Sequence, residues 1–244
     1  MGAHTEAIIL TVGDEITSGD IENSNGSWLA QQLAELGVRV RMLAAVGDDA
    51  GEIAGFVERY RETCGLLFAT GGLGGTPDDV TREGIARAFG VGLVVDEDAL
   101  ARLHEKFPER LHAYVTRFAE LPTGATPIRN PLGGAPGFRI GNVRVLPGVP
   151  AEMRGTFDEL RPELAEAGAD PIRTVRLSYA TTESEIVSVL EQAAETHPAV
   201  TVGSYPLFDG GTRRVDIVLK SQDTAALGAA ESWFGDQLAE VPGQ

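Results

Sequence analysis

The first part of the chain alternates short apolar runs with segments in which apolar residues recur at helical spacing. The run "AIILTV" (7–12) ends at Gly13 and is typical of a strand buried on both faces of a sheet. The same patterns predict further strands at 38–49 and 65–72, and helices at 24–37, 49–60 and 81–89. This order of strands and helices predicts a parallel α/β sheet with right-handed crossovers.

The remainder of the chain continues with mixed elements. We expect 96–118 to be mostly helical, 137–148 to form a hairpin that turns at Gly141 and Asn142, and a helix to begin near Pro150. Beyond 170 the pattern changes to strands at 174–178, 201–205 and 214–220, with a helix after the first strand and another at the end. We therefore predict two domains, 1–170 and 171–244, with a boundary near Asp170.

Several residues are candidates for helix caps. Asn23 to Asn25 offer capping side chains to the helix at 24–37, and Thr81 precedes the helix that carries Ile85. Thr182 and Glu185 have the spacing of a capping box. For Asn25, we expect helix capping, and the alternative is a hydrogen bond to a substrate hydroxyl.

The composition limits the possible partners and location. The 244 residues carry a formal charge of −16, which opposes binding to nucleic acid. No run of about eighteen apolar residues and no leader pattern occurs, so we expect no membrane association and a cytoplasmic location. Lys106 and Lys220 are the only lysines, and this arginine-rich, acidic composition is typical of a halophilic protein, although an acidic mesophile fits it as well.

Acidic residues follow three of the predicted parallel strands, in the loops "GDEITSGD", "VGDD" and "TGGLGGTPDDVT". The carboxyl ends of parallel strands meet at one edge of a sheet, where such folds bind ligands. Like charges that converge there raise one another's pKa, and either a divalent cation or exposure to solvent would relieve the repulsion. The acids concerned are Asp14, Glu15, Asp20, Asp48, Asp49, Asp78 and Asp79.

The segment from Thr70 to Thr81 has the composition of a loop that binds phosphate. Its glycines allow the backbone amides to approach phosphate oxygens, and a predicted helix follows. No lysine follows the glycines as in a Walker A loop, and the glycine spacing differs from the dinucleotide fingerprint. Asp78 and Asp79 suggest that phosphate charge is offset through a metal ion; the alternative is that one aspartate caps the helix and the glycines only turn the chain.

Five motifs in order resemble the molybdopterin-binding superfamily, and most closely the N-terminal domain of the CinA (competence/damage-inducible) proteins. They are "GDEITSGDIENSN", "TGGLGGTPDDVT", "NPLGGAPGF", "LPGVPAEM" and "GSYP". The resemblance implies an α/β fold with a three-layer, mostly parallel sheet that has a mixed edge, followed by a small α/β domain. One departure is Gly75, which stands where the family usually has proline and loosens the loop.

The resemblance also implies an activity: a pyrophosphatase that cleaves nucleoside diphosphate compounds such as ADP-ribose or FAD. It implies a divalent metal, Co²⁺ or Mg²⁺, with help from K⁺, and a homodimer. The alternatives are a pterin-binding or adenylyltransferase step in molybdenum cofactor assembly, and a non-catalytic nucleotide-binding dimer module. The deamidase activity of full-length bacterial relatives is not expected.

The candidate site residues come from these motifs. The catalytic and metal-binding candidates are Asp48, Asp78 and Asp79. The substrate-binding candidates lie in the loops after the first and third strands and in the two later motifs: Gly13, Asp14, Glu15, Asn25, Thr70, Gly71, Gly72, Gly74, Gly75, Thr76, Asn130, Gly134, Ala135, Pro136, Gly137, Pro147 and Gly148. We expect the residues from Asn130 to Gly137 to close over a nucleotide, and Pro147, Gly148 and Pro150 to shape a base or sugar pocket or only the turn.

Overall fold

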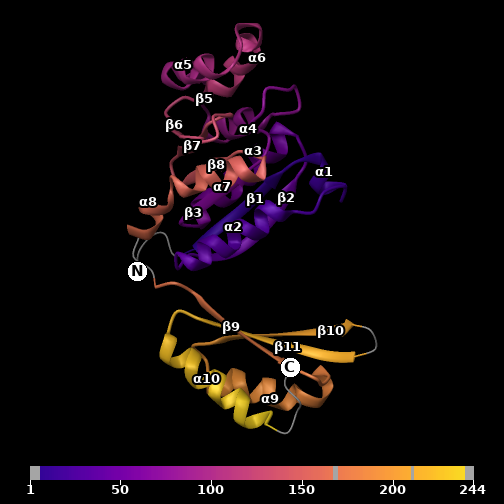
Figure 1. The fold of residues 1–244 in the computed structure, drawn as a ribbon. Coiled ribbons are helices and arrows are strands. Elements are labelled where there is room, and N and C mark those ends of the chain that lie inside the picture. Colours follow the sequence, from indigo (N-terminus) through magenta and orange to yellow (C-terminus); the bar gives the residue numbers. More distant parts are fainter. Residues whose placement is uncertain (1–5, 167–169, 210–211, 240–244) are drawn as a thin grey trace. The chain divides into compact units, whose positions relative to one another are not determined.

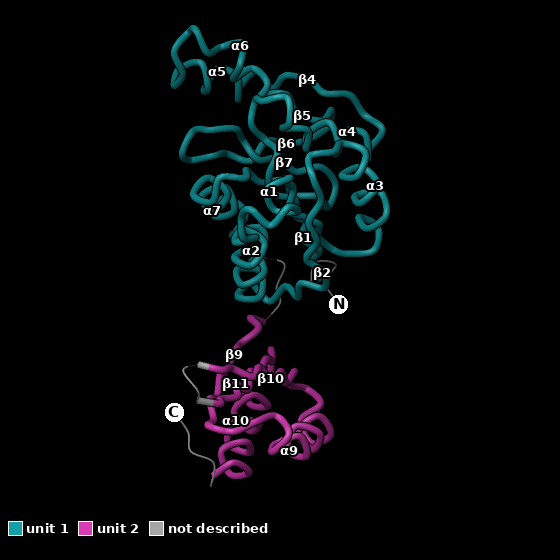
Figure 2. Tube along the Cα trace, turned by 90° about the vertical axis from the view of Figure 1, so that its right-hand side faces the viewer, with its two compact units in different colours: residues 1–169 teal, residues 170–244 magenta. Residues whose placement is uncertain are grey.

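The computed structural model describes residues 6–166, 170–209 and 212–239. The chain divides into two compact units, Met1–Ala169 and Asp170–Gln244 (Figure 2). Each unit has its own sheet and its own hydrophobic core. Within the described residues, no helix has both the length and the apolar character needed to cross a membrane.

The first unit is built on a six-stranded sheet with the order β2-β1-β3-β8-β7-β6. The strands are β1 (Glu6–Val12), β2 (Arg39–Val46), β3 (Leu66–Thr70), β6 (Thr126–Ile128), β7 (Gly137–Ile140) and β8 (Val143–Leu146). β2, β1, β3 and β8 run parallel, whereas β7 and β6 add an antiparallel edge. The predicted parallel sheet with a mixed edge is confirmed, as is the hairpin of β7 and β8.

Helices cover both faces of this sheet, which gives three layers. Helices α2 (Ser24–Glu35) and α7 (Pro150–Asp158) lie on one face, and α3 (Ala50–Tyr60) and α4 (Thr81–Phe89) lie on the other (Figures 1 and 2). Successive residues of a strand point to opposite faces, so Ile9 packs in the α2–α7 core while Leu10 packs in the α3–α4 core. This two-sided burial explains why most residues of β1 and β3 are apolar.

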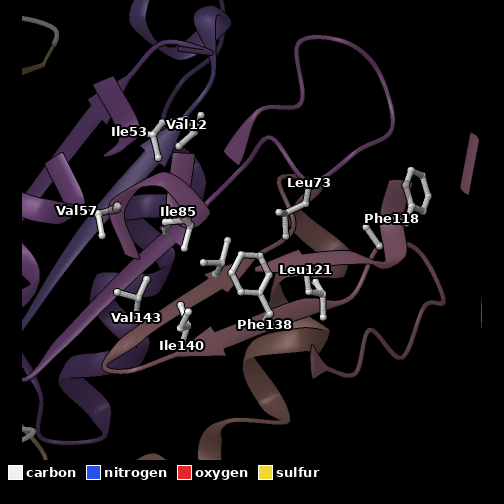
Figure 3. Packing of buried hydrophobic residues seen from close by; sticks show 14 of the residues in the cluster. Val12, Ile53, Val57, Leu73, Ile85, Phe118, Leu121, Phe138, Ile140 and Val143 are labelled. Atoms are coloured by element: carbon white, nitrogen blue, oxygen red, sulfur yellow. The ribbon is translucent and has the colours of Figure 1, made fainter. Parts of the chain in front are cut away.

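The segment predicted as mostly helical at 96–118 is broken into short pieces. These are α5 (Glu97–Lys106), η2 (Glu109–Leu111), α6 (His112–Thr116) and η3 (Arg117–Ala119). α5 ends before Pro108, since a residue that precedes a proline is disfavoured in the helical conformation. Phe118 nevertheless belongs to the same buried cluster as Leu73 and Leu121 (Figure 3), so these pieces take part in the α3–α4 core.

Short elements surround the main ones and were not predicted. The strands β4 (Leu93–Val95) and β5 (Glu120–Pro122) form a separate antiparallel pair. The remaining short helices are α1 (Asp14–Thr17), η1 (Arg61–Thr63) and α8 (Arg161–Glu166). Of these, α1 lies in the loop between β1 and α2 and bears on the site.

The second unit is a three-stranded antiparallel sheet with the order β10-β11-β9. Its strands are β9 (Arg173–Tyr179), β10 (Thr201–Asp209) and β11 (Thr212–Ser221), and its helices are α9 (Glu183–Thr196) and α10 (Thr224–Gln237). Both helices lie on the same face of the sheet (Figure 1), where Ile217 and Phe234 are fully buried. The predicted capping box of Thr182 and Glu185 is confirmed at the start of α9.

Candidate functional site

The three acidic loops meet at one edge of the first sheet. Val12 pairs with Val46 and Thr11 with Thr70 in parallel register, so β1, β2 and β3 end side by side. The prediction that their loops share an edge is confirmed. A cleft of about 410 Å³ opens there.

Residues from four segments line this cleft. The lining comprises Thr11, Val12, Gly13, Glu15, Ile16, Ile21, Glu22, Asn23, Ser24, Asn25, Asp48, Thr70, Gly71, Gly72, Asp78, Asp79, Gly148, Val149 and Pro150. Ten predicted site residues are among them: Gly13, Glu15, Asn25, Asp48, Thr70, Gly71, Gly72, Asp78, Asp79 and Gly148. The structure therefore brings the candidate catalytic acids and much of the glycine-rich segment to one place.

Asp14 does not line the cleft, because its side chain is engaged with the second loop. Its Oδ1 accepts a hydrogen bond from the N–H of Asp48 at 3.0 Å, and its own N–H donates to Asp48 Oδ2 at 2.9 Å. Gly47 makes this approach possible, since a Cβ there would lie 2.5 Å from Asp14 Oδ1. The first and second loops are thus joined by a reciprocal pair of hydrogen bonds.

Negative charge is concentrated around Asp48. Burial raises the pKa of Asp48, and the hydrogen bond from the N–H of Asp14 opposes that rise. The carboxylates of Asp14, Glu15 and Asp78 raise the pKa further by repulsion. The half-buried Asp48 thus carries its charge at a cost that a bound cation would reduce.

The glycine loop, residues 70–79, requires glycine where it passes close to other backbone. Gly71 has φ 109°, and a Cβ there would overlap the carbonyl oxygen of Val12. The N–H of Gly71 donates to Leu146 O at 3.3 Å, and the N–H of Gly74 donates to Asp79 Oδ1 at 2.7 Å. Two of the amides that were candidates for phosphate binding are therefore engaged within the protein.

Two predicted helix caps are wrong. Val80 is the N-cap of α4, and the Thr81 hydroxyl donates to Gly71 O at 2.8 Å, which holds the end of β3 against the helix. Asn23, and not Asn25, caps α2 by accepting from the N–H of Gly26. Asn25 Nδ2 donates instead to Gly148 O at 2.7 Å and links α2 to the turn before α7.

The third predicted loop lies outside the cleft lining. Asn130 is buried and donates from Nδ2 to Ala135 O at 3.0 Å and to Glu152 Oε2 of α7 at 2.9 Å, so its amide closes its own loop. The predicted residues that do not line the cleft are Asp14, Gly74, Gly75, Thr76, Asn130, Gly134, Ala135, Pro136, Gly137 and Pro147. Closure of the 130–137 loop over a nucleotide stays a prediction.

Apolar side chains of the cleft were missed by sequence reasoning. Ile21 and Val149 are 56% and 57% exposed, and both line the cleft together with Ile16. Ile16 and Ile21 belong to "GDEITSGDIENSN" and Val149 to "LPGVPAEM", so the available signal was an apolar residue inside a polar motif. The cleft therefore has an apolar part beside its acidic part.

The cleft is negatively charged overall, which bears on cation binding. Its lining carries five carboxylates, Glu15, Glu22, Asp48, Asp78 and Asp79, and no lysine or arginine among the residues that the structure describes. Within that described part of the chain, no three His, Cys, Asp or Glu side chains are arranged to hold a metal ion by themselves. Mg²⁺ is commonly bound through one or two carboxylates, waters and the substrate phosphates, so these residues fit a cation shared with a substrate.

Comparison with known families agrees with this fold. Residues 8–166 match the family model described as a probable molybdopterin binding domain. Residues 171–241 match the model of the FAD synthase middle domain. The chain therefore belongs to the probable molybdopterin binding domain family.

Individual relatives narrow this assignment. The chain is 39% identical over 82% of its length to a protein of Archaeoglobus fulgidus, of which it covers 86%. It is 37% identical over 90% of its length to a CinA-like protein of Frankia casuarinae, of which it spans about half (54%). The crystal structure of a CinA protein of unknown function from Thermoplasma acidophilum superposes with a TM-score of 0.61 and 35% identity, over 66% of this chain and 99% of that one. The resemblance to the CinA N-terminal domain is confirmed.

Proposed function

We propose that this protein hydrolyses the pyrophosphate bond of nucleoside diphosphate compounds such as ADP-ribose or FAD, with a divalent cation, Co²⁺ or Mg²⁺, and with K⁺ as a helper. The observation that carries the proposal is the cleft itself. It combines a glycine loop, five carboxylates with no lysine or arginine among the described lining residues, and apolar side chains in about 410 Å³. That volume lies within the range of small-molecule sites.

The acidic part of the cleft supports the cation requirement. A pyrophosphate group is itself an anion, and five carboxylates in the lining would repel it. Asp48 and Asp78 would hold the cation, with Glu15 beside them. A bound divalent cation would neutralise the phosphate oxygens and lower the pKa of a water molecule in contact with it.

The apolar part of the cleft supports a substrate with a flat ring. Ile21 and Val149 offer exposed apolar surface, and burying it against an adenine or flavin ring is favourable at about 25 cal/mol per Å². The match of residues 171–241 to the FAD synthase middle domain is consistent with a nucleotide substrate. Gly148 and Pro150 would shape the turn between the ring and the phosphates.

The test is AMP release from ADP-ribose and from FAD by the purified full chain, measured with EDTA, with Mg²⁺ and with Co²⁺. We expect AMP only when the metal is present, and a loss of roughly a hundredfold in turnover for Asp78→Asn. Asp49→Asn is the matched control, since Asp49 caps α3 and does not line the cleft. Tight binding without turnover would overturn the hydrolase proposal and favour a binding module that acts as a homodimer.

A pterin ligand is the second candidate, because the matching family model is named for molybdopterin binding. The same cleft would then take a pterin phosphate, and the reaction would be adenylyl transfer from ATP. Incubation with ATP and a pterin phosphate separates this candidate from hydrolysis, since the pterin phosphate attacks the α-phosphate of ATP and the products are an adenylylated pterin and pyrophosphate, with no AMP. We also propose that the protein is cytoplasmic and forms a homodimer. Light scattering after size-exclusion chromatography would test the homodimer.

A further inference from the structure

Two arginine side chains hold the carbonyl side of the glycine loop. Arg82 of α4 is only 2% exposed; its Nη1 donates to Gly74 O at 3.0 Å and its Nη2 donates to Leu73 O. Arg117 of η3, which is half-buried, donates from Nη1 to Gly75 O at 3.0 Å. Three consecutive carbonyl groups of the loop thus accept hydrogen bonds from guanidinium groups.

Two of the three amides of the same peptide units, those of Gly74 and Thr76, donate hydrogen bonds to Asp79. In a trans peptide the carbonyl of one residue and the N–H of the next point in opposite directions, so the amides of residues 74–76 point away from the arginines. Asp79 Oδ1 accepts from Gly74 N at 2.7 Å, and Oδ2 accepts from Thr76 N at 2.9 Å and from Thr76 Oγ1 at 2.5 Å. The orientation of the loop is therefore determined by charged groups on both sides.

Gly75 gives the loop a residue with few conformational restrictions, so contacts from outside the loop can contribute to its geometry. Glycine has more backbone freedom than any other residue, and proline has the least. Around Gly75 the space is filled by aromatic rings: a Cβ there would lie 2.8 Å from Cε2 of Tyr114 and 3.0 Å from Cε1 of Phe118. These rings and Arg117 come from the same segment, 112–119, so this segment supports the loop at Gly75.

Keeping Arg82 buried is costly. Burial lowers the pKa of Arg82 to about 10, so the side chain stays charged near neutral pH. Its Nε is buried without a hydrogen-bond partner in the described structure. A buried charge with an unpaired N–H destabilises a fold unless its other contacts compensate, and here those contacts are the loop carbonyls.

We infer that Arg82 and Arg117 are positioning residues of the phosphate site, which orient the peptide units of residues 73–76 so that the amides of Gly74 and Thr76 hold the carboxylate of Asp79, a residue that lines the cleft. They supply through hydrogen bonds the rigidity that a proline at position 75 would supply through its ring. The role in catalysis rests on the proposed function, whereas the role in loop geometry does not.

Hydrogen exchange of the free protein tests the geometric part. The variants are Arg82→Met, Arg82→Lys and Arg117→Met, and the readout is amide exchange in peptides that cover residues 71–79. We expect exchange to accelerate about tenfold in both methionine variants, since each removes charged donors from the loop carbonyls. Unchanged exchange in both would overturn the inference.

Arg144→Met is the matched control. Arg144 is also buried, at 7% exposed, and donates from Nη1 to Gly141 O and Val143 O of the β7–β8 turn, away from the cleft. Its removal should leave exchange of residues 71–79 unchanged. If Arg82→Met does not fold, Arg117→Met alone decides the question, because Arg117 is less buried.

Steady-state kinetics of ADP-ribose hydrolysis test the catalytic part. We expect kcat/KM to fall about tenfold in Arg117→Met at an unchanged unfolding temperature, and Arg82→Lys to retain more activity than Arg82→Met. Faster exchange with wild-type kinetic constants would overturn the positioning role. If the wild-type chain does not hydrolyse ADP-ribose, the proposed function fails, and the exchange experiment still decides whether the arginines orient the loop.

Discussion

Asp14 and Asp48 exchange hydrogen bonds between their backbones and carboxylates, at 2.9 and 3.0 Å, and so join the loops that follow β1 and β2. Both groups are acids, so the contact brings like charges together while satisfying two N–H groups. The neighbouring cleft contains further carboxylates, and their repulsion also acts on Asp48.

Replacement of Asp14 separates the repulsion between the two carboxylates from the hydrogen bond to the N–H of Asp48. Asp14→Asn removes the charge and keeps an oxygen that can accept from Asp48, whereas Asp14→Ala removes both. We expect Asp14→Ala to be less stable than Asp14→Asn by about 1 kcal/mol, the usual value of one such hydrogen bond. Urea unfolding measures the difference, and equal midpoints for the two variants would contradict a stabilising role for the bond.

Asp48 gives the protein a predictable dependence on pH. Because its folded-state pKa is raised, the stability that Asp48 contributes is fully present below its unfolded pKa of about 3.9 and is lost as pH rises through the folded-state pKa. We therefore expect Asp48→Asn to unfold at a higher temperature than wild type near pH 7. The advantage should vanish as pH falls below about 4, which thermal unfolding across pH would show.

Millimolar Mg²⁺ provides a control for the Asp48 result. If repulsion between carboxylates lowers the stability of wild type relative to Asp48→Asn, Mg²⁺ should raise the unfolding temperature of wild type more than that of the variant. An equal effect of Mg²⁺ on both proteins would mean that the cation does not bind near Asp48.

The packing around Gly75 predicts coupling with Tyr114. Gly75→Ala would bring a Cβ to 2.8 Å from the ring of Tyr114, and overpacking of this kind costs about 1–3 kcal/mol. We expect Tyr114→Ala to recover part of that loss, measured as a double-mutant cycle. Gly92→Ala is the control, because a Cβ there meets nothing within 4 Å. Strictly additive effects would show that the ring does not occupy the space beside Gly75.

The apolar part of the cleft predicts a binding defect without a chemical one. Val149→Ser and Ile21→Ser should raise KM for ADP-ribose by about tenfold and leave kcat unchanged, since the ring is bound equally in the ground and transition states. Val94→Ser is the matched control, because Val94 is 51% exposed but does not line the cleft. A fall in kcat at constant KM would show that these side chains act on the chemical step and not on ring binding.

Much of the first unit could be predicted because its central strands β1 and β3 are buried on both faces. The run from Ala7 to Val12 is apolar for that reason, and its parallel neighbours follow from the alternation with helices. The pair β4 and β5 could not be predicted, since strands of three residues are too short to show a period. The two strands pair with each other although they lie far apart in the sequence, and a local sequence pattern cannot predict such a pairing.

The site was predictable where motifs carried acids and glycines, and not where its geometry depends on tertiary contacts. Arg82 lies in a helix at a position where the sequence suggests a solvated side chain, but the loop carbonyls of Leu73 and Gly74 cover it. Asn23 and Asn25 are equivalent candidates for a cap in the sequence. Only the position of Gly148 relative to α2 decides that Asn25 has another partner.

The absence of lysine and arginine from the described lining of the cleft has a consequence for catalysis in different salt concentrations. Most proteins that recognise phosphate attract it with basic side chains, and added salt weakens them by screening that attraction. Here salt would screen repulsion instead, so KM for an anionic substrate should fall as ionic strength rises. The proposed hydrolysis would then become more effective in concentrated electrolyte, with no change in the structure of the protein.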